Sequence, residues 1–537
     1  MITRRNVLIG GASIPLLTFL GMMEARADTP KDVLVVAMPL DNLTSLDPHE
    51  SFEGTGSELC SNIYQRLVAP NRQDPSKLDP ILAESWEADA DGKVFTFKIR
   101  QDAKFATGNP VTAEDVAFSL HRVVSMSKGP AFIINQFGYD ADNVQKMIVA
   151  EDPTTLKITT GRPVAIAFLL YCLSHTAGSI VEKKVALEKQ INDKDGKPDW
   201  GNEFMRKNSA GSGSFKLISW KPSENLVLEV NPHGDYKGNI KRIMFLHVTD
   251  PATQLLMLEK GDVDVVRNLG TEQLQTVLAG DKFNVVETAM ASTTIVSLNQ
   301  KVEALRNPKV WQAIRWAIDY EGIQKNIVPL TYKVHQTFLP EGFPGAIPDM
   351  PYKQDLKKAK ELLTEAGYPD GFDVSMDHYA VQPVPDIAQV IQANLAEIGI
   401  RLKLLSAENR QVLTKMRARE HEMALTAWAS DYYDPHSEAT AFVINEDNSD
   451  NPKNKPFCWR SSWQNEEMNK KAIAARDEKD PATRIKMYEE LQRDHYVNSP
   501  FIFLLQRNLF AVTNKNVEGV YLGALSTSHS YKDVVKK

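Results

Sequence analysis

Several patterns are scarce in this sequence of 537 residues, and each shortage argues against a class of protein. Only three cysteines occur, Cys60, Cys172 and Cys458, and they form no CxxC pair. A redox pair or a zinc framework is therefore not supported, and we expect all three side chains to be buried and apolar. Beyond the N-terminus, no stretch approaches the run of about 18 apolar residues that predicts a membrane-spanning helix.

A basic excess is also missing. The chain carries 62 Lys and Arg against 69 Asp and Glu, a formal net charge of −7. It therefore has no excess of positive charge to neutralise the phosphates of a nucleic acid. Hydrophobic residues make up 42% and charged residues 24%, which is typical of a soluble globular protein. The length predicts more than one domain or one large two-lobed unit.

Catalytic and metal-binding signatures are absent from the sequence as well. It contains no GxSxG elbow, no P-loop and no GxGxxG fingerprint, and the eleven histidines show no metal-ligand spacing. The segment HEMAL at 421–425 begins like a zinc-protease motif, but Leu425 stands where the second histidine is needed. The Gly-rich segment 209–215 has no lysine to hold a phosphate, so it predicts a tight turn before a strand.

The N-terminus has the features of an export signal. Arg4 and Arg5 precede a weakly apolar stretch, and the segment 3–8 resembles a twin-arginine signal. The small-x-small pattern at 25–27 predicts cleavage near Ala27 and Asp28. We therefore predict a signal peptide at 1–27 and a mature protein in the periplasm. Export by the general secretory route stays open. A lipid anchor is not expected, because no cysteine lies near the cleavage site.

Strand-like and helix-like patterns alternate along the rest of the chain, which indicates an α/β fold. The strand-like runs are 33–38, 94–100, 243–248 and 400–405. Helix starts are predicted from capping residues, with Thr112 and Asp115 in a capping-box spacing and Asn307 and Asp355 as N-caps. Gly367 predicts a helix end.

Several separated segments resemble the bacterial extracellular solute-binding proteins of family 5, the receptors of peptide, nickel and opine ABC importers. The most specific match is 80–123, with its Leu-Ala-Glu-Ser-Trp run, Asp-Gly hairpin and PVTAEDV run in order. Six further segments fit the family pattern, namely 45–68, 209–238, 250–266, 310–323, 359–372 and 391–405. The resemblance covers nearly all of 32–505.

The resemblance implies a two-lobed periplasmic binding protein of type II, with an extra subdomain in the larger lobe. Lobe 1 is expected to comprise 28–290 and 506–537, with the extra subdomain at about 70–200, and lobe 2 to comprise 291–505. Hinge closure on the ligand is the implied mechanism. The expected partners are a peptide or small-molecule ligand and the permease subunits of an ABC transporter. We expect no enzyme activity, cofactor or metal, and a monomer.

The segment LTAWASDYYDPHS at 425–437 carries the expected charge anchor. In the peptide-binding branch of the family a Trp-x-x-Asp-Tyr segment follows a strand, and its Asp holds the ligand ammonium. Trp428, Asp431 and Tyr432 match that spacing, so Asp431 is predicted as the anchor and the two rings as walls of the site. The alternatives are that Asp431 only forms a turn and that Trp428 packs in the core.

Other contacts follow from the resemblance less directly. Dipeptide binders hold the ligand carboxylate with an arginine in the segment that corresponds to 375–389, but no arginine occurs there, and His378 and Tyr379 are the polar candidates. In lobe 1 the segment 51–58 matches a cleft-facing part of the family. Gly54, Thr55 and Gly56 are therefore predicted to offer backbone contacts, against the alternative of a plain turn.

Two alternatives stay open at this point. The family also includes receptors for opines, oligosaccharides, nickel chelates and haem, and the sequence does not distinguish these ligands from peptides. From another class, an exported hydrolase would use Asp431 and Asp434 as an acid pair. Asp434 precedes a proline, so a role in a turn is favoured for it.

Overall fold

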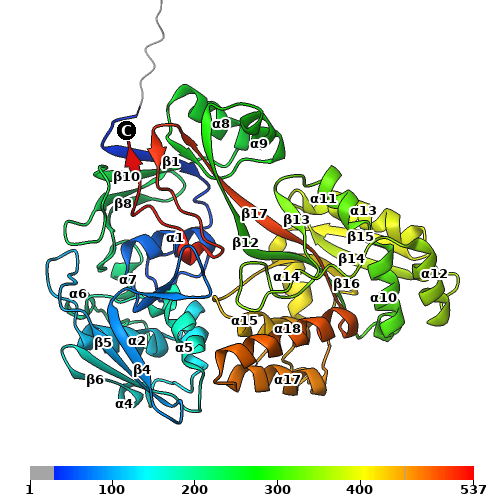
Figure 1. The fold of residues 1–537 in the computed structure, drawn as a ribbon, viewed down its shortest axis with the longest axis horizontal. Helices are drawn as coiled ribbons and strands as arrows, with labels where there is room; N and C mark the ends of the chain where they lie inside the picture. Colours follow the sequence, from blue (N-terminus) through cyan, green and yellow to red (C-terminus); the bar gives the residue numbers. More distant parts are fainter. Residues whose placement is uncertain (1–28, 453) are drawn as a thin grey trace, which may run out of the picture.

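The computed structural model describes residues 29–452 and 454–537, and the predicted signal peptide lies outside them. Within the described residues, eleven strands form one continuous mixed sheet, in the order β15-β14-β16-β12-β17-β11-β1-β10-β9-β8, with β13 paired to β17. The sheet extends through both halves of the molecule. We call the half built on β1 and β8 to β11 lobe one, and the half built on β14 to β16 lobe two (Figure 1).

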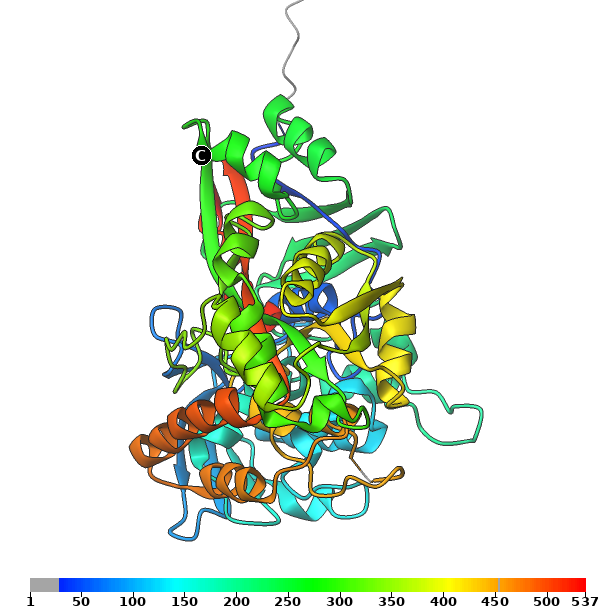
Figure 2. The ribbon, with the colours of Figure 1, turned by 90° about the vertical axis from the view of Figure 1, so that its right-hand side faces the viewer.

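Two long strands connect the lobes. Strand β12 (Phe283–Leu298) and strand β17 (Phe501–Asn514) pair antiparallel along most of their length. Figure 2 shows the same two strands running together down the molecule after a quarter turn. The pairing register shifts between Ala289 and Thr293, and such an irregularity bends a strand locally. This bend lies between the part of β12 that pairs in lobe one and the part that pairs with β16.

Lobe one contains both described ends of the chain. Strand β1 (Val33–Met38) is the centre of its sheet and pairs in parallel with β10 (Arg242–His247) and with β11 (Val265–Val266). Strands β8 (Phe215–Lys221) and β9 (Asn225–Val230) extend the sheet outward. Helix α1 (Gly54–Ile63) packs against the 3-10 turn η4 (Ser526–Ser528), so the C-terminal segment lies beside the first helix (Figure 1).

An additional small sheet is inserted into lobe one between α1 and β8. It has the order β4-β5-β7-β6 and is antiparallel throughout. We call this unit the extra subdomain; it also contains helices α2 and α5. The bounds are β4 (Ala83–Ala88), β5 (Val94–Ile99), α2 (Ala113–Met126), β6 (Ile148–Asp152), β7 (Thr155–Thr159) and α5 (Ile166–Leu173).

Lobe two has a parallel sheet covered by helices. Strand β14 (Asp373–Tyr379) pairs in parallel with β15 (Arg401–Ala407) and with β16 (Met423–Ala429). The carboxyl ends of these three strands therefore lie along one edge of the sheet. The covering helices are α10 (Pro308–Ala317), α12 (Leu356–Glu365), α13 (Val384–Ala396), α14 (Asn409–Arg417), α15 (His436–Phe442), α17 (Glu466–Asp477) and α18 (Pro481–Asn498).

The predicted helix starts are confirmed. The Thr112 hydroxyl accepts from the Asp115 backbone N–H and the Asp115 carboxylate accepts from the Thr112 N–H, which is a complete capping box. Asn307 caps α10 and Asp355 caps α12, and Gly367 follows α12 with a φ of +92°. The four predicted strands correspond to β1, β5, β10 and β15, and the Gly-rich segment leads into β8.

The lobes and the extra subdomain contact each other away from the connecting strands. Arg162 Nη1 of the extra subdomain lies 2.5 Å from Asp477 Oδ1 of lobe two. The ring of Tyr432 lies 6.1 Å from the ring of Phe168, centroid to centroid, and Tyr432 packs into the core of the extra subdomain. Lobe two and the extra subdomain are thus in direct contact at these residues.

The three cysteines are buried, as predicted, and all three are free. In the part of the chain that the structure describes, no helix combines the length and the apolar character needed to cross a membrane.

Candidate ligand-binding site

Asp431 lies at the carboxyl edge of the lobe-two sheet, two residues after the end of β16. The strand forms because MALTAWA supplies a buried apolar run that pairs with β12 on one side and with β14 on the other. The chain leaves the sheet at Ser430 and turns into the short helix α15. This placement brings the side chain of Asp431 to the edge where α/β sheets bind ligands.

Backbone hydrogen bonds hold this turn against the connecting strand and the C-terminal segment. The Ser430 N–H donates to the Ala291 carbonyl at 2.9 Å, and the Ala291 N–H donates to the Ala524 carbonyl at 2.8 Å. The Asp431 N–H donates to the Ser437 hydroxyl at 3.1 Å. The position of Asp431 is therefore coupled to the irregular part of β12, where the two lobes meet.

A cavity of about 280 Å³ lies between the lobes at this point. Lobe two contributes Asp431 and its neighbours Ala429 and Ser430, the connecting strand contributes Met290 and Ala291, and lobe one contributes the rest. The lobe-one residues are Phe52, Gly54, Ser57, His175, Ala524, Leu525, Ser526 and Thr527. A cavity bounded by both lobes binds a ligand more tightly when the lobes are closed, which is the requirement for hinge closure on a solute.

The Asp431 carboxylate has no ion pair and accepts no hydrogen bond among the described residues, although it faces this cavity. Burial raises the pKa of Asp431 to about 7, and the guanidinium of Arg460 opposes this rise only in part. Asp431 is half-buried, and its carboxylate is less well solvated than one on the surface and gains no compensating contact from the protein. A cationic group of a ligand would supply that contact.

Two charged residues beside Asp431 were not anticipated from the sequence. Glu438 of α15 is fully buried, and both of its carboxyl oxygens lack a hydrogen-bond partner in the described chain. Burial raises the pKa of Glu438 well above its usual value; the Ser430 hydroxyl lies beside it and limits the rise. Arg460 is the nearest cation to Asp431, and its Nε is buried without a partner. Isolated Glu and Arg residues carry no sequence signal for such a position.

His175 lines the cavity from the lobe-one side. It immediately precedes the 3-10 turn η2 (Thr176–Gly178), and its Nδ1 accepts the Ala177 N–H at 3.0 Å. Burial lowers the pKa of His175 to about 3, and the nearby Arg66 adds to this effect. The imidazole is therefore neutral at physiological pH. Asp431 lies 256 positions later in the chain, so only the tertiary structure brings the two residues to one site.

The predicted lobe-one contacts lie at the start of α1. Gly54 lines the cavity, and a Cβ there would come within 3.2 Å of the Ser526 hydroxyl. Thr55 and Gly56 do not line it, and Gly56 packs closely against Ser51 in the interior. Backbone contacts from this segment stay a prediction.

The predicted aromatic walls lie away from this cavity. Trp428 packs edge-on against Phe442 and Phe457 at centroid distances of 5.6 and 5.8 Å. Tyr432 donates from its hydroxyl to Gln136 Oε1 of the extra subdomain at 3.4 Å and lines no part of the cavity. Ligand contacts by these two rings are untested predictions.

The remaining predicted contacts lie at the end of β14. His378 is buried, with its Nδ1 3.0 Å from the Tyr379 carbonyl, and neither His378 nor Tyr379 lines the cavity. Asp434 is directed away from Asp431 and is buried in a two-point ion pair with Arg484, at 2.7 and 2.8 Å. The two aspartates are not arranged as an acid pair that could share a substrate.

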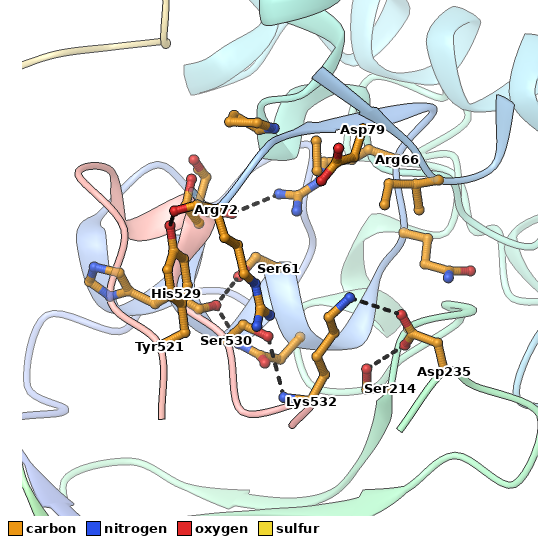
Figure 3. Close-up of a pocket in the computed structure, with 18 of the residues that line it drawn as sticks. Ser61, Arg66, Arg72, Asp79, Ser214, Asp235, Tyr521, His529, Ser530 and Lys532 are labelled. Atoms are coloured by element: carbon orange, nitrogen blue, oxygen red, sulfur yellow. Dashed lines mark hydrogen bonds and ion pairs between the residues drawn. The ribbon is translucent and has the colours of Figure 1, made fainter. Parts of the chain in front are cut away.

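A second cavity, of about 330 Å³, lies within lobe one (Figure 3). Figure 3 shows Lys532 facing Asp235, at 3.7 Å, and Arg72 of the same cavity pairs with Asp533 at 2.5 Å. These charges largely neutralise one another. Arg66 donates to the Thr527 carbonyl at 2.9 Å, and Thr527 lines both cavities, so this region supports the wall of the interlobe cavity.

A two-lobed α/β molecule with a cavity between its lobes, and with an unpaired carboxylate in that cavity, defines the class of solute-binding proteins that close on a ligand. The sequence matches the family model described as bacterial extracellular solute-binding proteins, family 5 Middle, over residues 77–450. The chain belongs to this family.

Known relatives cover nearly the whole chain. The Escherichia coli (strain K12) protein named "Probable D,D-dipeptide-binding periplasmic protein DdpA" is 30% identical over 503 residues, which cover 92% of each chain. The glutathione-binding protein GsiB of Salmonella typhi is 26% identical, over 94% of this chain and 96% of GsiB. Among solved structures, DppA of Helicobacter pylori in complex with the peptide STSA matches with a TM-score of 0.75 and 26% identity, over 92% and 96% of the two chains.

Proposed function

We propose that the protein is the periplasmic receptor of an ABC importer and that it binds peptides or related amine-bearing solutes between its lobes. Asp431 holds the ligand ammonium. The observation that carries this proposal is the Asp431 carboxylate itself, which faces the interlobe cavity without a partner among the described residues. Related proteins named for dipeptides, glutathione and the peptide STSA support an amine-bearing ligand.

The geometry of Asp431 favours a cation over an uncharged ligand. A charge-assisted hydrogen bond from an ammonium to a carboxylate is roughly twice as strong as a neutral one, and exclusion of water strengthens it further. Closure of the cavity would exclude that water. An uncharged sugar would leave the carboxylate buried without a counter-ion, which is unfavourable.

Ligand binding would be coupled to closure through the two connecting strands. The Ser430 N–H is bonded to Ala291 in the irregular part of β12, so a ligand on Asp431 contacts lobe two at the bend. Contacts to lobe one on the other side of the cavity then favour the closed arrangement. The closed form would be recognised by permease subunits in the inner membrane, as the family membership suggests.

The volume of the cavity favours small ligands. About 280 Å³ is at the lower end of the range for ligand pockets. We therefore propose a ligand about the size of a dipeptide. No hydrolytic role is proposed, because Asp434 is held by Arg484 and is not available as a second acid.

The test is a thermal-shift and calorimetric screen of the mature protein. The panel contains L-Ala-L-Ala, D-Ala-D-Ala, glutathione, tri- and tetrapeptides, mannopinic acid, a maltooligosaccharide and Ni(L-His). At least one peptide is expected to raise the melting temperature in proportion to the logarithm of its concentration. A shift from the sugar or the metal chelate alone would contradict the proposal.

The matched variants are Asp431→Asn and Asp370→Asn. The first keeps the shape of the anchor and removes its charge, and the second changes an exposed aspartate elsewhere in lobe two. Binding of the peptide is expected to fall at least about tenfold in Asp431→Asn, since a charged hydrogen bond contributes about 1.5 to 3 kcal/mol. Unchanged binding in Asp431→Asn would rule out Asp431 as the ammonium anchor.

A further inference from the structure

His175 faces the interlobe cavity from lobe one, and its hydrogen-bonding state follows from a neighbour. The Ala177 backbone N–H donates to His175 Nδ1 at 3.0 Å. Since a backbone N–H can only donate, Nδ1 must present its lone pair, and the ring proton of the neutral imidazole must reside on Nε2. The structure thus fixes one tautomer of His175.

The Nε2–H of this tautomer is a donor without an acceptor. His175 is 4% exposed, and its Nε2 makes no hydrogen bond within the described residues. A donor that has no acceptor within the protein and is accessible from a cavity is a candidate for a ligand contact. Because His175 lines the cavity, an acceptor atom of a ligand can complete its hydrogen bonding.

The surroundings of the ring keep it in place and uncharged. The edge of the Phe52 ring packs against the imidazole at a centroid distance of 5.9 Å. The segment after His175 is bound to the chain that follows α1, because the Ile180 N–H donates to the Gln65 carbonyl at 2.9 Å. Gly178 allows the tight turn, because a Cβ there would lie 2.3 Å from the Leu173 carbonyl oxygen. The donor is therefore held rigidly.

The electrostatics of the cavity give the ligand a direction. Asp431 supplies negative charge at the lobe-two side. On the lobe-one side the charged group close to His175 is Arg66, a buried guanidinium whose described contact is the Thr527 carbonyl. Arg66 lies behind the cavity wall, and its charge favours an oxygen-rich end of a ligand toward lobe one and an ammonium toward Asp431. A neutral donor at position 175 suits that oxygen.

We propose that His175 is the lobe-one specificity residue of the site and that its Nε2–H donates to a carbonyl or carboxylate oxygen of the ligand. This inference rests on the proposed function, in which Asp431 holds the ammonium. The ligand class is thereby narrowed to solutes that carry an ammonium and, toward the other lobe, an oxygen acceptor. A simple alkyl amine lacks that acceptor and binds weakly.

The tautomer is tested without any ligand. Protein labelled with ¹⁵N-histidine is observed by two-bond ¹H–¹⁵N correlation between pH 5 and pH 8, and the signals of His175 are identified by their loss in His175→Gln. We expect a protonated Nε2, an unprotonated Nδ1 and no titration. A proton on Nδ1, or an imidazolium forming in this range, would overturn the proposal.

The contact is tested by calorimetry with the tighter of L-Ala-L-Ala and D-Ala-D-Ala as the probe. His175→Leu removes the donor, His175→Gln places an amide N–H near the position of Nε2, and His233→Leu is the control at an exposed histidine. The affinity is expected to fall about tenfold in His175→Leu, to stay within about threefold in His175→Gln, and to be unchanged in His233→Leu.

The outcomes separate this inference from the proposed function. If the wild-type protein binds the dipeptide and His175→Leu binds it equally well, the role of His175 is refuted and the proposed function stands. If no peptide of the screening panel binds the wild-type protein, both fall. The C-terminal amide of the probe tests whether the acceptor is charged: lost sensitivity to His175→Leu indicates the terminal carboxylate, and equal sensitivity indicates a neutral carbonyl oxygen. Hexylamine, with no acceptor, should bind all variants equally weakly.

Discussion

Asp434 and Arg484 form a two-point ion pair in which Nη2 and Nη1 lie 2.7 and 2.8 Å from the two carboxylate oxygens, and both side chains are buried. Asp431 is three residues away, and its carboxylate forms no ion pair and accepts no hydrogen bond among the described residues. The same sequence segment thus contains one aspartate whose charge is paired inside the fold and one whose carboxylate is unpaired, which we propose as the anchor for the ligand ammonium.

Replacement of Asp434 by alanine is expected to destabilise the fold strongly. The change leaves the Arg484 guanidinium buried without an anion, so the free energy of unfolding should fall by about 3 to 5 kcal/mol. Chemical denaturation followed by circular dichroism measures it. Asp373→Ala is the control, because the Asp373–Arg401 pair at 2.5 Å is largely exposed and should contribute less than about 1 kcal/mol. Equal losses in the two variants would contradict this view of Asp434.

The affinity for an amine-bearing ligand is expected to depend on pH through Asp431. Its pKa of about 7 in the free protein means that the carboxyl is largely protonated at pH 6, and it must lose that proton to hold an ammonium. The dissociation constant for the dipeptide should therefore rise by up to about tenfold for each pH unit below 7, and it should rise again above about pH 8, where the α-ammonium of the ligand loses its proton. Calorimetry in buffers of different ionisation enthalpy should detect proton release at pH 6. A flat affinity from pH 5 to pH 8 would refute the assignment.

Glu438→Gln is expected to stabilise the unliganded protein at high pH. Burial raises the pKa of Glu438 in the folded state, so the folded protein binds this proton more tightly than the unfolded chain. Wild-type stability is then lost as the pH rises from the unfolded pKa of about 4.3 toward the folded value. The melting temperature of Glu438→Gln should exceed that of the wild type at pH 8, and the difference should vanish near pH 4. Glu188→Gln, at an exposed position, should show no such trend.

The contact between Arg162 and Asp477 should favour the closed arrangement of the lobes. Asp477→Ala removes an ion pair of 2.5 Å between the extra subdomain and lobe two, in which both side chains are partly exposed. Because such pairs contribute up to about 1 kcal/mol, the dipeptide affinity should fall by at most about fivefold, and the radius of gyration of the free protein in small-angle X-ray scattering should increase. Glu151→Ala breaks a similar pair inside the extra subdomain, Glu151–Lys157, and should change neither quantity.

The helix starts, the strands and the position of Asp431 could be predicted from the sequence, because they depend on neighbouring residues in the chain. Capping by Thr112 and Asp355 is decided by residues one turn away, and the strand before Asp431 is apparent from its apolar run. The direction of a side chain after a strand ends is not decided locally. Tyr432 matches the expected spacing but packs on Phe168, which lies more than 260 positions earlier.

The lobe-one side of the site could not be predicted from the sequence, for the same reason. His175 and Thr527 have no pattern in common, and only the return of the chain through β17 brings the C-terminal segment beside α1. Glu438 is fully buried on the short helix α15, and Phe442 of the same helix packs against Trp428 at the end of β16. Side chains that meet through such packing need the tertiary structure to be recognised.

Strands β12 and β17 also determine how this molecule can be taken apart. Ser297 and Phe501 are paired neighbours, so the roughly 200 residues between them leave lobe one and return to it at the same place. Lobe two is therefore a cassette with adjacent ends, and a cassette of this kind can be exchanged between related receptors by joining the chain at two neighbouring points. Such an exchange would transfer Asp431 with its surroundings while His175 stays behind, so the chimera would combine the proposed amine site of one receptor with the proposed oxygen site of another.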